Sequence, residues 1–174
     1  MALSLLEYRD LCADTDTAKF ICGDAEIDKW FRTKSHRDHF SGKHIVTCAR
    51  FDGEEPVIGF YALSSVVEDA KKLPGVAFFP FSSDRFFPCV QLVYLAVHKP
   101  IQRRGYGAII MGQVIRTFAN VGAAIGIPAL IVTPLNDDAK RFYTSLGFEP
   151  YERGTRMFLP LQTALAAVEG LASE

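Results

Sequence analysis

The alternation of apolar and polar positions divides the chain into short segments that predict a mixed α/β fold. Residues 24–40 place apolar side chains on one face and basic side chains on the other, and Asp24 can cap this predicted helix. Residues 44–51 and 57–63 have the composition of strands, and a turn over residues 52–56 separates them. We therefore expect an antiparallel hairpin after the first helix.

The second half of the chain shows the order strand, turn, helix twice. Residues 91–97 predict a strand, and a glycine-containing turn leads from it into a buried helix that starts at Tyr106. Residues 129–133 predict the next strand, after which Asn136 can cap a helix that Gly147 ends. This order predicts two adjacent strands that are each followed by a helix.

Two other segments are less regular. Residues 64–89 contain a short predicted helix from about Glu68 to Lys72 and a stretch rich in phenylalanine and proline, which could be core or a lid over a substrate cleft. Residues 155–161 predict a last strand, and a weakly amphipathic tail follows it. Because no repeat or linker interrupts the 174 residues, we expect a single domain over residues 1–174.

Composition and charge exclude several classes of protein. Hydrophobic residues make up 49% of the chain and charged residues 22%, as in ordinary globular proteins. The net charge is −1, so a nucleic acid would need a local basic patch. Such a patch exists between residues 29 and 50, where six basic residues stand against Asp38 alone; they are Lys29, Arg32, Lys34, Arg37, Lys43 and Arg50. This run is either a solvated face or a surface for a phosphate backbone.

Cysteine and histidine spacing gives no sign of a metal or disulfide framework. The four cysteines show no CxxC or CxxH spacing, which favours a reducing cytoplasm. His36, His39 and His44 lack a further ligand at the usual spacing, so we expect no metal. The first residues have no basic segment, and no apolar run approaches about 18 residues, so we expect neither export nor a membrane partner.

The turn before Tyr106 has the chemistry of an anion site. Gly105 and Gly107 remove side chains where a phosphate would approach the backbone, and Arg103 and Arg104 add positive charge. The start of the following helix aims backbone N–H groups and the positive end of its dipole at the same place. The alternative is a plain turn with solvated arginines.

Two segments carry a resemblance to a known family. The segment 95–107, LAVHKPIQRRGYG, resembles the pyrophosphate-binding motif of the GNAT superfamily of N-acetyltransferases, with Gln102, Gly105 and Gly107 at its defining positions. The segment 136–148, NDDAKRFYTSLGF, resembles the second signature of that family. Residues about 22–161 share the resemblance, and the absence of Gly-Lys-Ser/Thr and of a third glycine excludes the Walker A and Rossmann motifs.

The resemblance implies an α/β (α+β) GNAT fold. Its mixed, mostly antiparallel sheet has splayed parallel fourth and fifth strands, is flanked by helices, and holds acetyl-CoA in the cleft between those two strands. The implied cofactor-binding residues come from the fourth strand, the turn and the start of the second signature; they are Leu95, Ala96, Val97, Gln102, Arg103, Arg104, Gly105, Tyr106, Gly107 and Asn136.

The family mechanism is direct acetyl transfer to an amine. By position, Tyr143 is the acid that protonates the leaving thiolate, although a tyrosine on an amphipathic helix could also be a core residue. Glu68 is our candidate for the general base, with Asp69 beside it, and both could instead be solvated charges at a helix start. Asn136 is a helix cap, a contact to the pantetheine arm, or both.

Further segments are similar to the GNAT toxins of bacterial toxin–antitoxin pairs, which acetylate aminoacyl-tRNA. These are 22–31, 59–68 and Pro88 before the fourth strand, although His98 and residues 41–44 depart from the usual toxin pattern. The resemblance implies an aminoacyl-tRNA acceptor, an antitoxin partner and a homodimer. The alternatives are an acetyltransferase for a small-molecule or protein amine, and an acyl-CoA-binding module without activity, which the intact Tyr143 disfavours.

Overall fold

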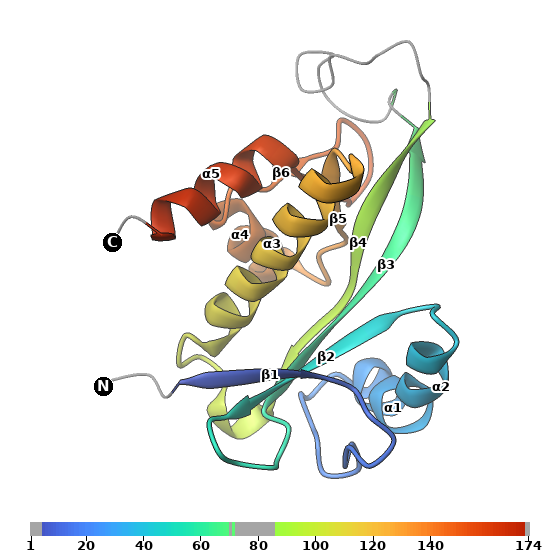
Figure 1. Ribbon diagram of the computed structural model, residues 1–174, viewed down its shortest axis with the longest axis vertical. Helices are drawn as coiled ribbons and strands as arrows, with labels where there is room; N and C mark the ends of the chain where they lie inside the picture. Colours follow the sequence, from blue (N-terminus) through green and yellow to red (C-terminus); the bar gives the residue numbers. More distant parts are fainter. Residues whose placement is uncertain (1–4, 70, 72–85, 173–174) are drawn as a thin grey trace. The chain divides into compact units, whose positions relative to one another are not determined.

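The computed structural model describes residues 5–69, 71 and 86–172 (Figure 1). These residues divide into two compact units, of which the first is Met1–Ser64 with Val93–Val114 and the second is Ser65–Leu92 with Ile115–Glu174. Most of the expected short helix after Glu68 and of the phenylalanine-rich stretch lies outside the described residues.

The helices and strands are divided between the two units. The first unit contains β1 (Leu6–Asp10), α1 (Ala25–Thr33), α2 (Ser35–Phe40), β2 (Ile45–Phe51) and the 3₁₀ helix η3 (Lys99–Ile101). The second contains β5 (Ala129–Val132), α4 (Asp137–Ser145), β6 (Glu149–Pro150), β7 (Met157–Pro160) and α5 (Leu161–Ala172). Three elements have residues in both units; they are β3 (Gly59–Asp69), β4 (Phe86–Val97) and α3 (Tyr106–Ile125).

The described strands form one mixed sheet in the order β1-β2-β3-β4-β5-β7-β6. Its β4–β5 pair is parallel, with Val90–Leu92 opposite Leu130–Val132, whereas β1–β2, β2–β3, β5–β7 and β6–β7 are antiparallel. The fold class expected from the sequence is therefore confirmed. Strands β1 and β6 were not predicted, and β3 and β4 are longer than the predicted segments.

A cluster of aromatic rings forms the core of the first unit. The rings of Phe31 and Phe60 stack with centroids 3.9 Å apart, and Phe20 meets Phe60 edge-on at 5.2 Å. All three side chains are at most 2% exposed. Burial of a ring of this size contributes about 1.5–3 kcal/mol, so the cluster anchors α1 and the preceding loop to the hairpin β2–β3.

The single helix predicted over residues 24–40 is wrong, because the structure has two helices. Asp24 caps α1 as expected, since its carboxylate accepts the N–H groups of Glu26 and Ile27 at 3.0 Å. The Ser35 hydroxyl donates to the carbonyl of Phe31 at 2.5 Å, and Lys34 leaves the helical conformation with φ −127°. A side chain that bonds the carbonyl of the preceding turn competes with the helical ladder, which explains the break.

Helix α3 is a long apolar helix of 20 residues. By length and composition it could cross a membrane, a test that a buried core helix also passes. Ile110, Met111, Val114 and Phe118 on its inner face have no exposed surface. The helix therefore has a role in the protein core, as the pattern from Tyr106 onward predicted.

Candidate active site

The turn between β4 and α3 is braced by a glutamine. Gln102 Nε2 donates to the carbonyl of Cys22 at 2.6 Å and to that of Val97 at 2.8 Å. The side chain expected to mark a phosphate site is thus hydrogen-bonded to backbone carbonyls at the end of β4 and in the loop before α1. It fixes the course of the chain, and the polar groups that remain for an anion are backbone N–H groups and arginines.

The backbone of this turn has the conformation that an anion cradle requires. Gly105 has φ +91°, a region that side chains other than glycine rarely adopt, and Arg103 has φ +60°. The first helical bonds of α3 are donated by Ala108 and Ile109 to the Gly105 carbonyl, so Gly105 is the helix cap. Arg103 and the next residue, Arg104, are exposed. The turn therefore offers a helix N-terminus and two cations to one anion.

The end of β4 precedes this turn and is held by a histidine. His98 Nδ1 accepts the N–H of Ile21 at 3.2 Å, while Lys99 donates its N–H to the Ile21 carbonyl at 2.8 Å. The candidate cofactor residues Leu95, Ala96 and Val97 lie directly before the residues that bond to Ile21. Residues 95–97 and the turn thus belong to the first unit, and their relative positions are fixed there.

Tyr143 lies in the second unit on α4. Asn136 caps this helix, since its side chain accepts the N–H of Ala139 at 2.9 Å, which confirms the predicted cap. The Tyr143 side chain is buried, with its ring centroid 5.4 Å from those of Phe142 and Phe148. Burial raises the pKa of Tyr143 to about 12, so the hydroxyl keeps its proton at neutral pH. A proton donor is therefore present on α4.

Glu68 differs from its expected setting at a helix start. It lies near the end of β3, its side chain is 2% exposed, and its carboxylate accepts a hydrogen bond from Arg156. Burial raises the pKa of Cys89 to about 12 and the Glu68 charge adds to this shift. Burial and then Glu68 likewise raise the pKa of Tyr151. The expectation of a solvated charge is wrong, and action as a base would require the Arg156 pair to open.

We expect Glu68→Gln to lower the free energy of unfolding by about 2 kcal/mol. The amide cannot pair with the Arg156 charge, and the arginine, partly exposed, recovers only part of the loss from water. Urea unfolding followed by circular dichroism measures the stability. Turnover of the folded variant tests the general-base prediction separately, because loss of a base costs about 10²–10⁴-fold. An unchanged turnover would contradict that role for Glu68.

The basic run is only partly a surface feature. Lys29, Arg32, Lys34, Arg37 and Lys43 are exposed. Arg50 is 5% exposed and Asp38 is 2% exposed, so the expected patch loses one cation and its one acidic member. Among the described residues Lys29, Arg32 and Lys34 form no ion pair, whereas Arg37 and Lys43 pair with Asp38 at 3.0 and 3.9 Å. We call the five exposed residues the basic face.

An aromatic cluster beside the basic face was not predicted. The rings of Trp30 and Tyr94 lie 4.3 Å apart, and His44 meets Trp30 edge-on at 6.0 Å. Trp30 Nε1 also donates to the buried Asp38 carboxylate at 2.9 Å. Burial and then the Lys43 charge lower the pKa of His44, which keeps its ring neutral at pH 7. In the sequence, the only sign of this cluster was the toxin-like segment 22–31, which contains Trp30.

The histidines of the sequence analysis serve other roles in the described structure. His39 Nδ1 accepts the N–H of Val46 at 3.0 Å, and His44 lies among aromatic rings. Within residues 5–69, 71 and 86–172, no three side chains of His, Cys, Asp or Glu are grouped to hold a metal.

The comparisons with known proteins identify the family of this chain. The model of the acetyltransferase (GNAT) family matches residues 8–148, and the chain belongs to this family. It is an acetyl-CoA-dependent N-acetyltransferase.

Within this family, the chain is similar to toxins that acetylate tRNA. The chain is 31% identical over 136 residues to the tRNA-acetylating toxin of Mycobacterium tuberculosis (strain ATCC 25618 / H37Rv), which covers 77% of this chain and 78% of the relative. The structure of AtaT complexed with acetyl-methionyl-tRNAfMet superposes with a TM-score of 0.84 and 27% identity, covering 95% of this chain and 98% of that one. The structure of AtaTR bound with AcCoA gives 0.81 and 27%, covering 94% and 98%.

Proposed function

We propose that this enzyme transfers the acetyl group of acetyl-CoA to the α-amino group of an aminoacyl-tRNA and acts as the toxin of a toxin–antitoxin pair. The basic face carries the proposal. Five exposed cations on and after α1 and α2 provide a surface for a phosphate backbone, and three of them form no ion pair within the described residues. The tRNA-acetylating relative and the tRNA-bound AtaT structure support the same acceptor.

The turn fits the cofactor that the family uses. Gly105 has no Cβ to block the approach of a pyrophosphate and adopts φ +91°, and Arg103 and Arg104 are exposed beside it. We propose that the turn residues Gln102–Gly107 hold the pyrophosphate and that Leu95, Ala96, Val97 and Asn136 contact the pantetheine arm. When bound, acetyl-CoA supplies the thioester acetyl group.

The protein residues then have three tasks. A backbone N–H near the end of β4 polarises the acetyl carbonyl, and the uncharged amine attacks the carbonyl carbon as the nucleophile. Tyr143 donates its hydroxyl hydrogen to the sulfur as the carbon–sulfur bond breaks. Glu68 stays our candidate for the group that takes the proton from the amine, through opening of its pair with Arg156.

We expect acetylation of charged tRNA to fall steeply with salt. Five phosphate contacts on a single strand give a slope of about −3.5 in log affinity against log salt, or about 100-fold weaker binding between 50 and 200 mM potassium chloride. Acetyl-CoA binding changes far less, since one turn holds its anion. Transfer of labelled acetyl to pools of charged tRNA, polyamines, amino acids and peptides identifies the acceptor, and the salt series then tests it.

Charge reversal locates the contact. Arg32→Glu combined with Lys34→Glu should raise the KM for charged tRNA by at least about tenfold and reduce the salt slope, with the acetyl-CoA dissociation constant unchanged. Arg116→Glu, on the exposed face of α3, is the control for a charge reversed elsewhere, and Arg32→Glu alone is the single change that matches it. Equal effects of the two changes, or efficient acetylation of polyamines with every charged tRNA left untouched, would contradict the proposed acceptor.

The remaining assignments rest on this function. We propose that residues 1–174 form a single N-acetyltransferase domain that works in the cytoplasm, where charged tRNA and acetyl-CoA are found. We also propose an antitoxin protein and a second copy of the chain as partners. Growth arrest on expression of the chain alone, relieved by a protein encoded beside it, tests the antitoxin; sedimentation equilibrium tests the homodimer.

A further inference from the structure

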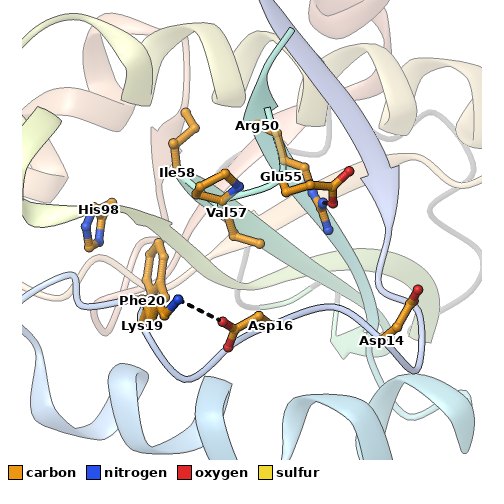
Figure 2. A pocket seen from close by; sticks show the side chains of 10 residues that line it. Asp14, Asp16, Lys19, Phe20, Arg50, Glu55, Val57, Ile58 and His98 are labelled. Carbon is orange, nitrogen blue, oxygen red and sulfur yellow. Dashed lines mark hydrogen bonds and ion pairs between the residues drawn. The ribbon is translucent and has the colours of Figure 1, made fainter. Parts of the chain in front are cut away.

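A cavity of about 330 Å³ lies in the first unit, and its lining residues, shown in Figure 2, include none of residues 102–107 and none of the basic face. Its walls come from the loop before α1, from the turn between β2 and β3, and from His98 at the end of β4. Ligand sites in proteins commonly measure about 300–1,000 Å³, so this cavity suits a ligand of amino-acid size. None of the roles proposed above uses it.

A buried arginine lines the cavity. The Arg50 side chain is 6% exposed, and its Nε atom is buried without a hydrogen-bond partner. Its Nη1 donates to a carboxylate oxygen of Glu55 at 2.5 Å. A buried guanidinium with unused N–H groups is costly unless an acceptor reaches it, and a carboxylate is the acceptor that matches its planar fork.

The carboxylate now bound to Arg50 is poorly held. The Glu55 side chain is 85% exposed and lies on the turn between β2 and β3, as Figure 2 shows. Water therefore competes for it, and ordering an exposed side chain in one position is unfavourable. Glu55 occupies the place that the carboxylate of a ligand would take.

The cavity is also lined by the carboxylate of Asp14 and by apolar side chains. Asp14 accepts a hydrogen bond from Cys12 Sγ at 2.9 Å, and this bond holds the pKa of Asp14 below its usual value, so the carboxylate is charged at neutral pH. Phe20, Val57 and Ile58 supply apolar surface, each less than 10% exposed. The lining also contains Lys19 and Asp16, which pair with each other at 3.8 Å. Arg50, Asp14 and the apolar wall are thus arranged around a single space.

We propose that this cavity binds a free α-amino acid with an apolar side chain. The ligand carboxylate replaces Glu55 on Arg50, its ammonium group pairs with Asp14, and its side chain packs on Phe20 and Ile58. An aminoacyl ester has no free carboxylate, so the site excludes charged tRNA and is separate from the acceptor of acetyl transfer. It stands whether or not the proposed acceptor is correct.

Isothermal titration of the full chain with leucine tests the proposal. We expect one saturable site, with binding at least tenfold weaker for leucinamide, which lacks the carboxylate, and for N-acetyl-leucine, which lacks the ammonium group. Absence of leucine binding, or leucinamide binding as tight as leucine, would overturn the proposal.

Substitutions place the ligand. Glu55→Ala should tighten leucine binding by about tenfold because the internal competitor is gone, whereas Glu54→Ala, one residue away in the same exposed turn, controls for the lost charge. Arg50→Met should remove binding. If Arg50→Met does not fold, Asp14→Asn gives a second test, with at least tenfold weaker leucine binding expected. Equal leucine affinities of the Glu55→Ala and Glu54→Ala proteins would overturn the assignment.

Discussion

Tyr143→Phe should reduce turnover by about 10²–10⁴-fold while the acetyl-CoA dissociation constant stays nearly unchanged. The substitution keeps the buried ring and its packing against Phe142 and Phe148, and it removes only the hydroxyl. Loss of a general acid has an effect of this size, whereas binding of the thioester does not need the proton.

The pKa of Tyr143 defines how the hydroxyl can act. At about 12 it exceeds the value of about 8.5 usual for a thiol, so proton transfer from the hydroxyl to sulfur is uphill by itself and must be coupled to cleavage of the carbon–sulfur bond and to release of the amine proton. Since the group stays protonated, Tyr143 should cause no falling limb in the rate between pH 7 and pH 10.

Single-turnover rates with labelled acetyl-CoA measure the Tyr143 effect. Tyr61→Phe is the control, because it removes a hydroxyl from another buried tyrosine, one that has no proposed role in the reaction. We expect that variant to keep turnover within a few-fold. A Tyr143→Phe enzyme that does the same would show that water or another residue protonates the thiolate.

Gly105→Val should abolish measurable acetyl-CoA binding, with a loss of at least about 100-fold in affinity. Valine resists a φ of +91°, and its side chain would occupy the approach of the pyrophosphate to the backbone. Gln102 braces the turn from outside, through Cys22 and Val97, so most of the fold should persist.

Calorimetry with acetyl-CoA on the folded variant tests the turn. Gly126→Val provides a matched control, because Gly126 has φ +76° with nothing within 4 Å of an added Cβ. That change carries the backbone strain without the pyrophosphate site. Unchanged cofactor affinity in a folded Gly105→Val protein would remove the assignment of the pyrophosphate to this turn.

Local signals account for the parts of the fold that the sequence predicted. The turn over residues 52–56 marked the hairpin, and Asn136 and Gly147 marked the ends of α4, because turn and cap chemistry depends on neighbouring residues. Strand β1 was missed because five residues, Leu6–Asp10, become a strand only through pairing with β2. The break at Lys34 depends on a local bond, from the Ser35 hydroxyl to the Phe31 carbonyl, that the pattern of apolar positions does not show.

The site shows a similar division. The two signatures identified the turn and Tyr143 through family resemblance. Burial of charge was not predictable, since sequence counts Arg50 with the exposed cations and Glu68 with solvated acids. In the fold, Arg50 is buried and donates to Glu55, and Glu68 is buried and accepts from Arg156. Which charges are buried depends on pairing between strands and segments far apart in the chain.

The hydrogen bond from the Ile21 N–H to His98 gives a structural reason for the residue at position 98. The toxin pattern usually has aspartate there, and histidine looks like a departure. The requirement in this structure is a lone pair for the Ile21 N–H, which an imidazole nitrogen or a carboxylate oxygen can supply. In this chain His98 meets the requirement with a nitrogen lone pair and without the negative charge of an aspartate.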